Sequence, residues 1–468
     1  MKRETLLTGA LLNMANAARL TEGDIHRPAW HLSPPAGLLN DPNGFIHFNG
    51  RYHLFYQWNP LACAHGAKWW GHWSSDNLIH WKNEPIALLP DQPYDSHGCY
   101  SGSAINDDGK LVLIYTGNVK FPGGRTAWQC LANVDADGKV EKRGPVLGLP
   151  EGYTGHVRDP KVWKHQERWY MVLGAQNLKL EGKVLLYCGE SLDQWRLVGE
   201  IAGSHLNGLG DFGYMWECPD MFTLGDQKVL ITCPQGLPAG EKCWLNTYQS
   251  GYFIGSLDYD NGAFTHNAFT ELDLGFEFYA PQTMETDDGR RILIAWMGIP
   301  DENEFYQPTI KHGWIHTLTC PRELKIEKGK LYQSPVAELQ HLRGQLVSQS
   351  GPAQSLEPLA IQQAELLIRA EGEWQAHFGQ ALTLKCSHEG LELTRTHLRT
   401  GEPESRYWLG EVQQLQILCD RSSVEIFINQ GEAVMSSRYF PDRAAVLTWQ
   451  GEGKVHVDCW QLKNAMIV

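Results

Sequence analysis

Short apolar segments separated by polar turns recur along the first two-thirds of the chain, and they follow one pattern. A short alternating segment ends at a turn rich in Gly, Asp or Asn, and a second, more apolar segment follows it. The second segments are residues 52–56, 111–115, 169–173, 229–231 and 292–295. Paired short segments joined by such turns are typical of β-hairpins. The sequence therefore predicts a series of hairpins.

A short motif precedes each hairpin, and the motifs are almost evenly spaced. They are Asn40-Asp41-Pro42-Asn43-Gly44, Tyr100-Ser101-Gly102-Ser103, Arg158-Asp159-Pro160, Glu217-Cys218-Pro219 and Phe278-Tyr279-Ala280-Pro281-Gln282. Successive anchors at 41, 101, 159, 217 and 280 lie 60, 58, 58 and 63 residues apart. Five such repeats, each with about four strands, predict a five-bladed β-propeller.

Three of the five motifs carry a carboxylate at or next to the anchor. In a propeller the first strand of every blade lines the central axis, so Asp41, Asp159 and Glu217 of blades one, three and four are predicted to face one cavity. An acid before a proline also commonly begins a turn, but three in register favour a shared site. Other acid-rich turns (107–109, 135–138, 258–262) lack the glutamate that completes a calcium loop, so we expect no metal site.

The pattern changes after about residue 335, which indicates a second domain. Residues 336–358 are rich in Ser, Gln, Gly and Pro and are predicted to be a linker, and residues 359–468 show regularly spaced short strands typical of a β-sandwich. Glu425 alternates with Val424 and Ile426, which predicts a strand residue on the solvent face. The expected organisation is all-β, with a propeller over 25–335 and a sandwich over 359–468.

The first 24 residues allow two interpretations. A basic start, an apolar run and small residues resemble a signal peptide, but Glu4 and Asn13 interrupt that character. The apolar residues also have helical spacing, and this favours an N-terminal helical segment over residues 1–24.

Composition narrows the class of protein. A length of 468 residues favours two domains, and a net charge of −14 without any basic run disfavours a nucleic-acid partner. No apolar run reaches membrane-spanning length. The 11 cysteines are scattered and odd in number, which favours reduced thiols and a cytoplasmic location. The oligomeric state stays open.

Two carboxylates flanking a glycosidic bond are the basic apparatus of sugar hydrolysis. Glu217 has apolar neighbours that favour its neutral form, so it is the candidate general acid/base. Asp41 lies among asparagines whose amides favour the anion, so it is the candidate nucleophile. Asp159 adjoins Arg158, which is expected to keep it ionised and able to stabilise developing positive charge.

The motif series resembles that of glycoside hydrolase family 32. The resemblance is carried by the five motifs above together with Trp30-His31-Leu32, Phe55-Tyr56-Gln57, Trp70-Gly71-His72-Trp73 and, near the C-terminus, Asp420-Arg421-Ser422-Ser423-Val424-Glu425-Ile426-Phe427. It runs from about Trp30 to the end of the chain. It implies a retaining β-fructofuranosidase without a cofactor, in which Asp41 attacks the fructosyl carbon, Glu217 is the acid/base and Asp159 stabilises the transition state.

The resemblance also implies residues that shape the sugar pocket. They are Asn40, Gln57, Trp70, Tyr100, Ser101, Arg158 and Tyr279. Leu38 and Leu39 replace the Trp-Met that often precedes the first motif, and Tyr100 replaces a frequent Phe, so these positions of the pocket wall are expected to tune substrate fit.

The sequences around Arg158 and Glu217 look most like the bacterial sucrose-6-phosphate hydrolase branch of the family. Candidate phosphate-binding cations are Lys120, Arg125, His156 and Lys161. Sucrose itself is the close rival substrate. Three alternatives remain: a fructan hydrolase, an inverting arabinan-type glycosidase and a propeller that binds sugar without catalysis.

Overall fold

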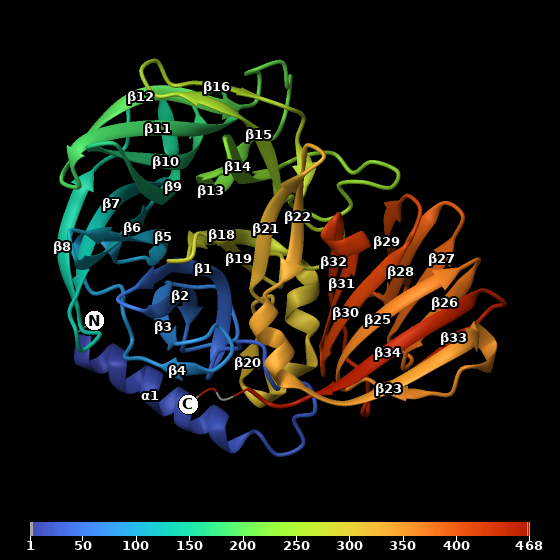
Figure 1. The fold of residues 1–468 in the computed structure, drawn as a ribbon. Coiled ribbons are helices and arrows are strands. Elements are labelled where there is room, and N and C mark those ends of the chain that lie inside the picture. The colour runs from blue at the N-terminus through green and yellow to red at the C-terminus, as the bar shows by residue number, and fades with distance from the viewer. Residues whose placement is uncertain (1–2, 466, 468) are drawn as a thin grey trace.

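The protein consists of a ring of five β-sheets followed by a β-sandwich (Figure 1). A computed structural model describes residues 3–465 and residue 467. The five sheets follow one another along the chain as blades, as the sequence predicted. Their strands are, for blade one, β1 (Gly37–Phe48), β2 (Arg51–Asn59), β3 (Trp69–Ser75) and β4 (Trp81–Asn83); for blade two, β5 (Cys99–Asp107), β6 (Lys110–Phe121), β7 (Gly124–Val134) and β8 (Val140–Leu147); for blade three, β9 (Tyr153–His165), β10 (Arg168–Asn177), β11 (Gly182–Ser191) and β12 (Gln194–Gly203); for blade four, β13 (Met215–Leu224), β14 (Gln227–Gln235), β15 (Gly251–Asp258), β16 (Ala263–His266) and β17 (Thr270–Glu271); and for blade five, β18 (Tyr279–Glu285), β19 (Arg291–Trp296), β21 (Arg322–Glu327) and β22 (Lys330–Pro335).

A late strand closes the ring. β20 (Trp314–Ile315) follows blade-five strand β19 in the chain, yet it pairs in parallel with β1 of blade one, with Gly37 opposite Trp314 and Leu38 opposite Ile315. Blade one is thereby tied to the blade-five segment of the chain, and the inner strands are fixed around one axis.

The predicted hairpin turns have the backbone that their sequences demand. Asn49 and Gly50 have φ values of 50° and 74°, and Asp108 and Gly109 have 47° and 84°. Two successive positive φ values give the tight turn whose twist matches paired strands, and Asn, Asp and Gly tolerate them best. These turns confirm the hairpin prediction.

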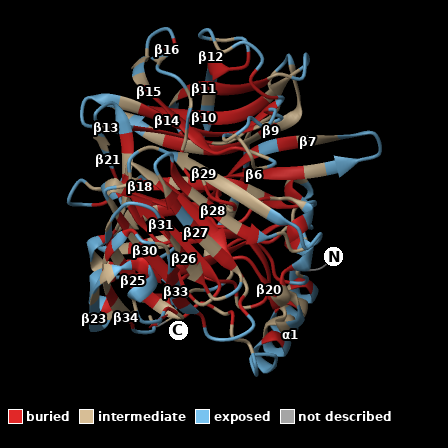
Figure 2. Cartoon of the chain, turned by 90° about the vertical axis from the view of Figure 1, so that its right-hand side faces the viewer, coloured by how far each residue is buried: buried red, intermediate tan, exposed pale blue. Residues whose placement is uncertain are grey.

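Tryptophans fill the interior of the propeller rather than its surface. Seven of those in the propeller strands are 1% exposed or less: Trp58, Trp69, Trp70, Trp73, Trp216, Trp296 and Trp314. Figure 2 shows the middle stretches of blade strands such as β10, β11 and β14 as buried. The high aromatic content therefore serves packing first.

The N-terminal segment forms α1 (Arg3–Arg19), which lies along blade one (Figure 1). Its buried residues are Leu6, Ala10 and Ala17, and the first two pack against Trp69 of β3. None of the helices in the described part of the chain is both long and apolar enough to cross a membrane. All 11 cysteines are free thiols, as predicted.

The C-terminal domain is a sandwich of two six-stranded sheets. One sheet contains β23 (Arg343–Pro352), β25 (Gln363–Glu371), β30 (Gln414–Asp420), β31 (Ser423–Ile428), β32 (Ala433–Arg438) and β34 (Lys454–Leu462). The other contains β24 (Leu359–Ala360), β26 (Trp374–Phe378), β27 (Leu382–Ser387), β28 (Gly390–Thr396), β29 (Pro403–Leu409) and β33 (Val446–Gln450). Six short 3-10 turns complete the elements: η1 (Pro93–Asp95), η2 (Glu302–Tyr306), η3 (Pro308–His312), η4 (Ala337–Leu342), η5 (Ala353–Ser355) and η6 (Asn429–Gly431).

The stretch 336–358, interpreted from its composition as a linker, is largely structured. It holds η4 and strand β23, which pairs with β34 from Arg343 to Pro352. β23 is an edge strand in which no residue is fully buried. An exposed edge strand buries few side chains and can therefore consist mainly of polar residues. For this reason the composition of β23 resembled that of a linker.

The prediction for Glu425 was wrong. Its side chain is fully buried, and it accepts hydrogen bonds from His31 Nε2 (2.6 Å), Arg322 NH2 (2.7 Å) and the backbone N–H of Cys320 (3.2 Å). The alternation along β31 is real, but the face opposite the sandwich core packs on the propeller and not on solvent. Periodicity cannot distinguish these two environments.

Candidate active site

The five sequence motifs are β-bulges in the first strands of the five blades. The pairing of each first strand with the second shifts register at its motif, between Leu39 and Pro42 in blade one and at the corresponding place in the other four. In three blades the residue before the proline has a positive φ: 68° at Asp159, 50° at Cys218 and 50° at Ala280. Such values are strained for residues with a Cβ and cluster at functional sites.

These bulges bring side chains of neighbouring blades into contact. Ser101 of blade two donates to Asp41 of blade one, and Cys218 of blade four contacts Asp41 and Asp159 through its thiol, at 3.7 and 3.5 Å. Arg158 of blade three and Tyr279 of blade five both donate to Glu217. The structure therefore gathers the three predicted acids into one cluster at the ring axis.

Asp41 lies in β1 and is held by two donors. Ser101 Oγ donates to its Oδ2 at 2.5 Å and Asn40 Nδ2 to its Oδ1 at 3.2 Å. Burial raises the pKa of Asp41 above its usual range, and the Ser101 and Asn40 hydrogen bonds offset only part of this rise. The expected amide donor is present, but the effect of burial on the Asp41 pKa outweighs it.

Glu217 lies in β13 and is bound on both oxygens. Arg158 donates to Oε1 from Nε (2.9 Å) and NH2 (2.6 Å), while Tyr279 Oη (2.6 Å) and Gln235 Nε2 (2.8 Å) donate to Oε2. Burial alone would raise its pKa, but the charge of Arg158 and these donors lower it below the usual value. The prediction that apolar neighbours keep Glu217 neutral is wrong, because Trp216 packs away from it into the blade core and Arg158 lies against it.

Asp159 lies in β9 and is 7% exposed. Its Oδ2 accepts from the backbone N–H of Cys218 at 2.9 Å. Burial and the charge of Glu217 raise its pKa to about 7. The adjacent Arg158 was expected to keep it ionised, but that side chain turns to Glu217 instead. Adjacency in a strand therefore did not establish the ion pair.

The predicted pocket residues fall into two groups. Asn40, Gln57, Ser101, Arg158 and Tyr279 contact one another or the acids; for example, Asn40 Nδ2 donates to Gln57 Oε1 at 2.6 Å. The residues of the other group are buried behind the pocket wall and pack against its backbone. Trp70 is fully buried and donates to the Tyr100 carbonyl at 3.0 Å, and Leu38 and Leu39 are fully buried in β1.

Sequence reasoning missed Lys68, which lies directly behind the nucleophile candidate. Lys68 is 5% exposed, and its Nζ donates to Asn40 Oδ1 at 3.0 Å and to His65 Nδ1 at 2.8 Å. Burial lowers its pKa to about 7. Since an ammonium only donates, it fixes the Asn40 amide with its NH₂ facing Asp41. The sequence signal that could have indicated a buried lysine here is its position directly before Trp69 and Trp70.

The network continues from Lys68 to blade five. His65 Nε2 lies 3.1 Å from Glu304 Oε1, and His316 Nε2 lies 2.9 Å from Glu304 Oε2. Burial would raise the pKa of Glu304, but the two histidines lower it to about 2. A second missed residue, Gln235, comes from the end of β14 and donates to both Glu217 and Tyr279.

Three of the four candidate phosphate-binding cations line one cavity. Lys120, Arg125 and His156 border a cavity of about 470 Å³. Lys161 does not, because its largely buried ammonium donates to the Thr283 carbonyl (2.6 Å) and lies 3.4 Å from Asp220 inside the propeller.

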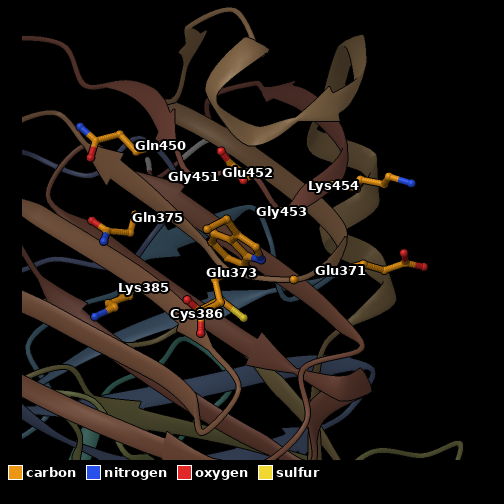
Figure 3. A pocket seen from close by; sticks show the side chains of 12 residues that line it. Glu371, Glu373, Gln375, Lys385, Cys386, Gln450, Gly451, Glu452, Gly453 and Lys454 are labelled. Atoms are coloured by element: carbon orange, nitrogen blue, oxygen red, sulfur yellow. The ribbon is translucent and has the colours of Figure 1, made fainter.

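The sandwich also has a cavity, of about 680 Å³, between the ends of its two sheets. Figure 3 shows that the charged side chains on its rim, including Glu371, Lys385 and Lys454, point in different directions. A ligand site generally has polar groups that converge on one position. This cavity therefore offers no alternative to the propeller cluster.

Comparison with known proteins agrees with this geometry. The model of the glycosyl hydrolases family 32 N-terminal domain matches residues 31–335, and that of the C-terminal domain matches residues 363–463. A protein of Salmonella typhimurium named sucrose-6-phosphate hydrolase is 57% identical over 95% of both chains, and one of Bacillus subtilis with the same name is 45% identical over 95% of both.

Solved structures show the same relationship. The sucrose-6-phosphate hydrolase from Lactobacillus gasseri superposes with a TM-score of 0.89 at 31% identity, over 99% of this chain and 98% of that one. A Bombyx mori β-fructofuranosidase of family 32 superposes with a TM-score of 0.88 at 32% identity, over all of both chains. The chain belongs to glycoside hydrolase family 32, and it is a glycoside hydrolase.

Proposed function

We propose that this protein is a retaining β-fructofuranosidase that hydrolyses sucrose 6-phosphate, and also sucrose, to fructose and glucose 6-phosphate or glucose. The observation that carries the proposal is the cluster of Asp41, Asp159 and Glu217 at the bulges of three blades. The substrate follows from the relatives, two of which are named sucrose-6-phosphate hydrolase and match nearly the whole chain.

In the first step the Asp41 carboxylate attacks the anomeric carbon of the fructosyl unit. Ser101 and Asn40 orient the attacking group through their hydrogen bonds. The bond from that carbon to the bridging oxygen breaks, and Glu217 gives its proton to this oxygen. The products are a covalent fructosyl ester on Asp41 and the released glucose 6-phosphate or glucose.

Glu217 can act as the acid only after it gains a proton, and the sugar supplies the means. Fructose hydroxyls that donate to Asp159 stabilise its anion and lower its pKa from about 7. The Asp159 charge then favours the protonated form of Glu217, because the two acids repel each other. A bound sugar that keeps Asp159 ionised therefore favours the protonated form of Glu217, which the first step uses.

In the second step Glu217, now an anion, removes a proton from a water molecule. The resulting hydroxide attacks the fructosyl carbon, the ester bond to Asp41 breaks, and fructose leaves; Asp41 is again a carboxylate and Glu217 again carries the proton that the first step uses. Asp159 stabilises the positive charge that develops on the sugar ring in both steps.

We also place the protein in the cytoplasm. The proposed substrate is a phosphorylated sugar, and the 11 free thiols suit a reducing compartment.

The test is methanolysis of sucrose followed by NMR. A retaining enzyme transfers fructose from its covalent intermediate to methanol and forms the methyl β-fructofuranoside. An α-product would establish the inverting mechanism, in which the carboxyl groups lie ~6.5–9.5 Å apart and not ~5–5.5 Å. If fructose is released faster from longer fructans than from sucrose 6-phosphate or sucrose, the result would favour a fructan hydrolase.

The non-catalytic alternative has its own test. If the parent protein is active and the Asp41→Asn variant binds sugar but releases no product, the result supports an enzyme over a sugar-binding protein. A parent protein that binds sugar and releases no fructose from any of these substrates would contradict it.

A further inference from the structure

A cation-lined cavity at the edge of the active site has the features of an anion site. It lies where the β6–β7 hairpin meets β9, and its lining is Lys120, Phe121, Arg125, His156 and three glycines, without an acidic residue. The hairpin tip is exposed and projects from its sheet (Figure 2). This chain carries a net charge of −14, so a pocket with basic side chains and no acid contrasts with the chain as a whole.

Two like charges lie directly opposite each other in this hairpin. Lys120 and Arg125 are cross-strand partners in β6 and β7. Like charges in this position destabilise a hairpin. Within the described residues neither forms an ion pair with a carboxylate. An anion between them would turn an unfavourable pair into a favourable one.

Arg125 is fixed in place but keeps one donor unused. Its guanidinium donates to Asn118 Oδ1 (2.7 Å), Tyr100 Oη (3.2 Å) and His156 Nδ1 (3.3 Å), which are all neutral acceptors. Its Nε is buried and has no hydrogen-bond partner. Gly155 makes the position possible, because a Cβ there would lie 2.3 Å from the Arg125 carbonyl.

His156 connects the cavity to the catalytic acid. Its Nδ1 accepts from Arg158 NH1 at 2.8 Å as well as from Arg125, so the ring carries its proton on Nε2. Burial and the two arginines lower the pKa of His156 to about 4, so the ring is neutral. Arg158 holds Glu217 with its other nitrogens. The cavity therefore lies on the side of the acid that protonates the leaving group.

We propose that Lys120, Arg125 and His156 form the subsite for the phosphate of the leaving glucose 6-phosphate unit. The assignment rests on the proposed function and names its specificity-determining residues. A phosphate there lies beside the Arg125 guanidinium and accepts from the His156 Nε2–H, and the Lys120 ammonium neutralises part of its charge. Sucrose leaves the same donors unsatisfied.

The test is the phosphate preference, defined as kcat/KM for sucrose 6-phosphate divided by kcat/KM for sucrose. We expect Lys120→Gln to lower this ratio by about threefold to tenfold, and Arg125→Gln by about tenfold to a hundredfold, since charge-assisted bonds to buried groups are the stronger. Lys110→Gln is the matched control, because Lys110 is an exposed lysine at the opposite end of β6, and it should leave both constants unchanged.

Two further readouts do not depend on the variants folding equally well. In the parent protein, added salt should lower kcat/KM for sucrose 6-phosphate more than for sucrose, because screening weakens only the charged contact. Glucose 6-phosphate should inhibit sucrose hydrolysis more strongly than glucose does, and inorganic phosphate more weakly than glucose 6-phosphate, because it occupies the subsite alone.

The possible failures are distinguishable. If both sugars are hydrolysed but the ratio is unchanged in Lys120→Gln and Arg125→Gln, or falls equally in Lys110→Gln, the subsite assignment is overturned and the proposed function stands. If the parent hydrolyses neither sugar, the proposed function itself fails.

Discussion

Two clusters of buried carboxylates, one at the propeller axis and one between the domains, show how the same residue types serve different purposes. Between the domains, Asp420 accepts from three successive backbone N–H groups and from His31. Arg322 bridges Asp273 (3.1 Å) and Glu425 (2.7 Å). Each of these acids is held by a cation and by further hydrogen-bond donors.

The axial cluster is not matched in this way. Its three acids share one closely bound arginine, Arg158, and a lysine whose pKa is near 7. The pKa of Asp159 is consequently raised to about 7. Burial would also raise the pKa of Glu425, but Arg322 and His31 stabilise its anion and lower its pKa to about 2. A surplus of carboxylate over cation keeps a proton exchangeable, which a catalytic site requires and a structural one does not.

The largest expected effect is on turnover. Asp41→Asn and Glu217→Gln should each lower kcat by at least ~10²–10⁴-fold, the usual worth of a positioned catalytic group. Steady-state kinetics with folding checked by circular dichroism measures this. Asp107→Asn, at the end of β5 in blade two, is the control. Near-normal turnover in a folded Asp41 or Glu217 variant would remove that residue from the mechanism.

Glu425→Gln should have the opposite profile. It leaves the Arg322 charge buried without its partner, so the free energy of unfolding should fall by about 3–5 kcal/mol, while kcat per folded molecule stays close to that of the parent. Denaturant unfolding and active-site titration measure the two quantities. Glu452→Gln, an exposed change in the same domain, should alter neither. A loss of turnover larger than the loss of folded protein would make the interface part of catalysis.

The interface should also respond to pH. Burial alone would lower the pKa of His31, but Asp420 and Glu425 raise it to about 9. A raised pKa stabilises the fold fully below about pH 6.5, and this contribution, about 3 kcal/mol, is lost as pH rises from 6.5 through 9. Unfolding curves across this range should show the decline, and His31→Gln should flatten it. An equal decline in both proteins would assign the effect to other groups.

The smallest expected effect concerns Lys68. Lys68→Met removes the cation that orients Asn40 and helps to ionise Asp41, so kcat should fall by about tenfold. The Asp41 pKa should rise, and the acid limb of the kcat/KM profile should therefore move to higher pH. Lys161→Met, another buried lysine of the propeller, should not move that limb. If the acid limb of the kcat/KM profile of Lys68→Met is not shifted, Lys68 contributes only to packing.

The comparison also shows what the sequence could predict. The repeat, the hairpin turns and the convergence of Asp41, Asp159 and Glu217 were all predictable, because bulge motifs and turns depend on local residue types such as Pro and Gly. The protonation pattern was not. Arg158 adjoins Asp159 in sequence but pairs with Glu217, and Glu425 looks exposed by periodicity but is buried. Both depend on which surface a strand face meets, and that is a property of the assembled domains.

The central claim is that Asp41 forms a covalent bond to fructose. The direct measurement is rapid acid quenching of the parent enzyme during turnover of sucrose 6-phosphate, followed by peptide mass spectrometry. We predict an added fructosyl unit on the peptide that contains Asp41, absent from Asp41→Asn. A fructosyl unit on the peptide of Asp159 or Glu217, or none on any peptide during active turnover, would contradict the account.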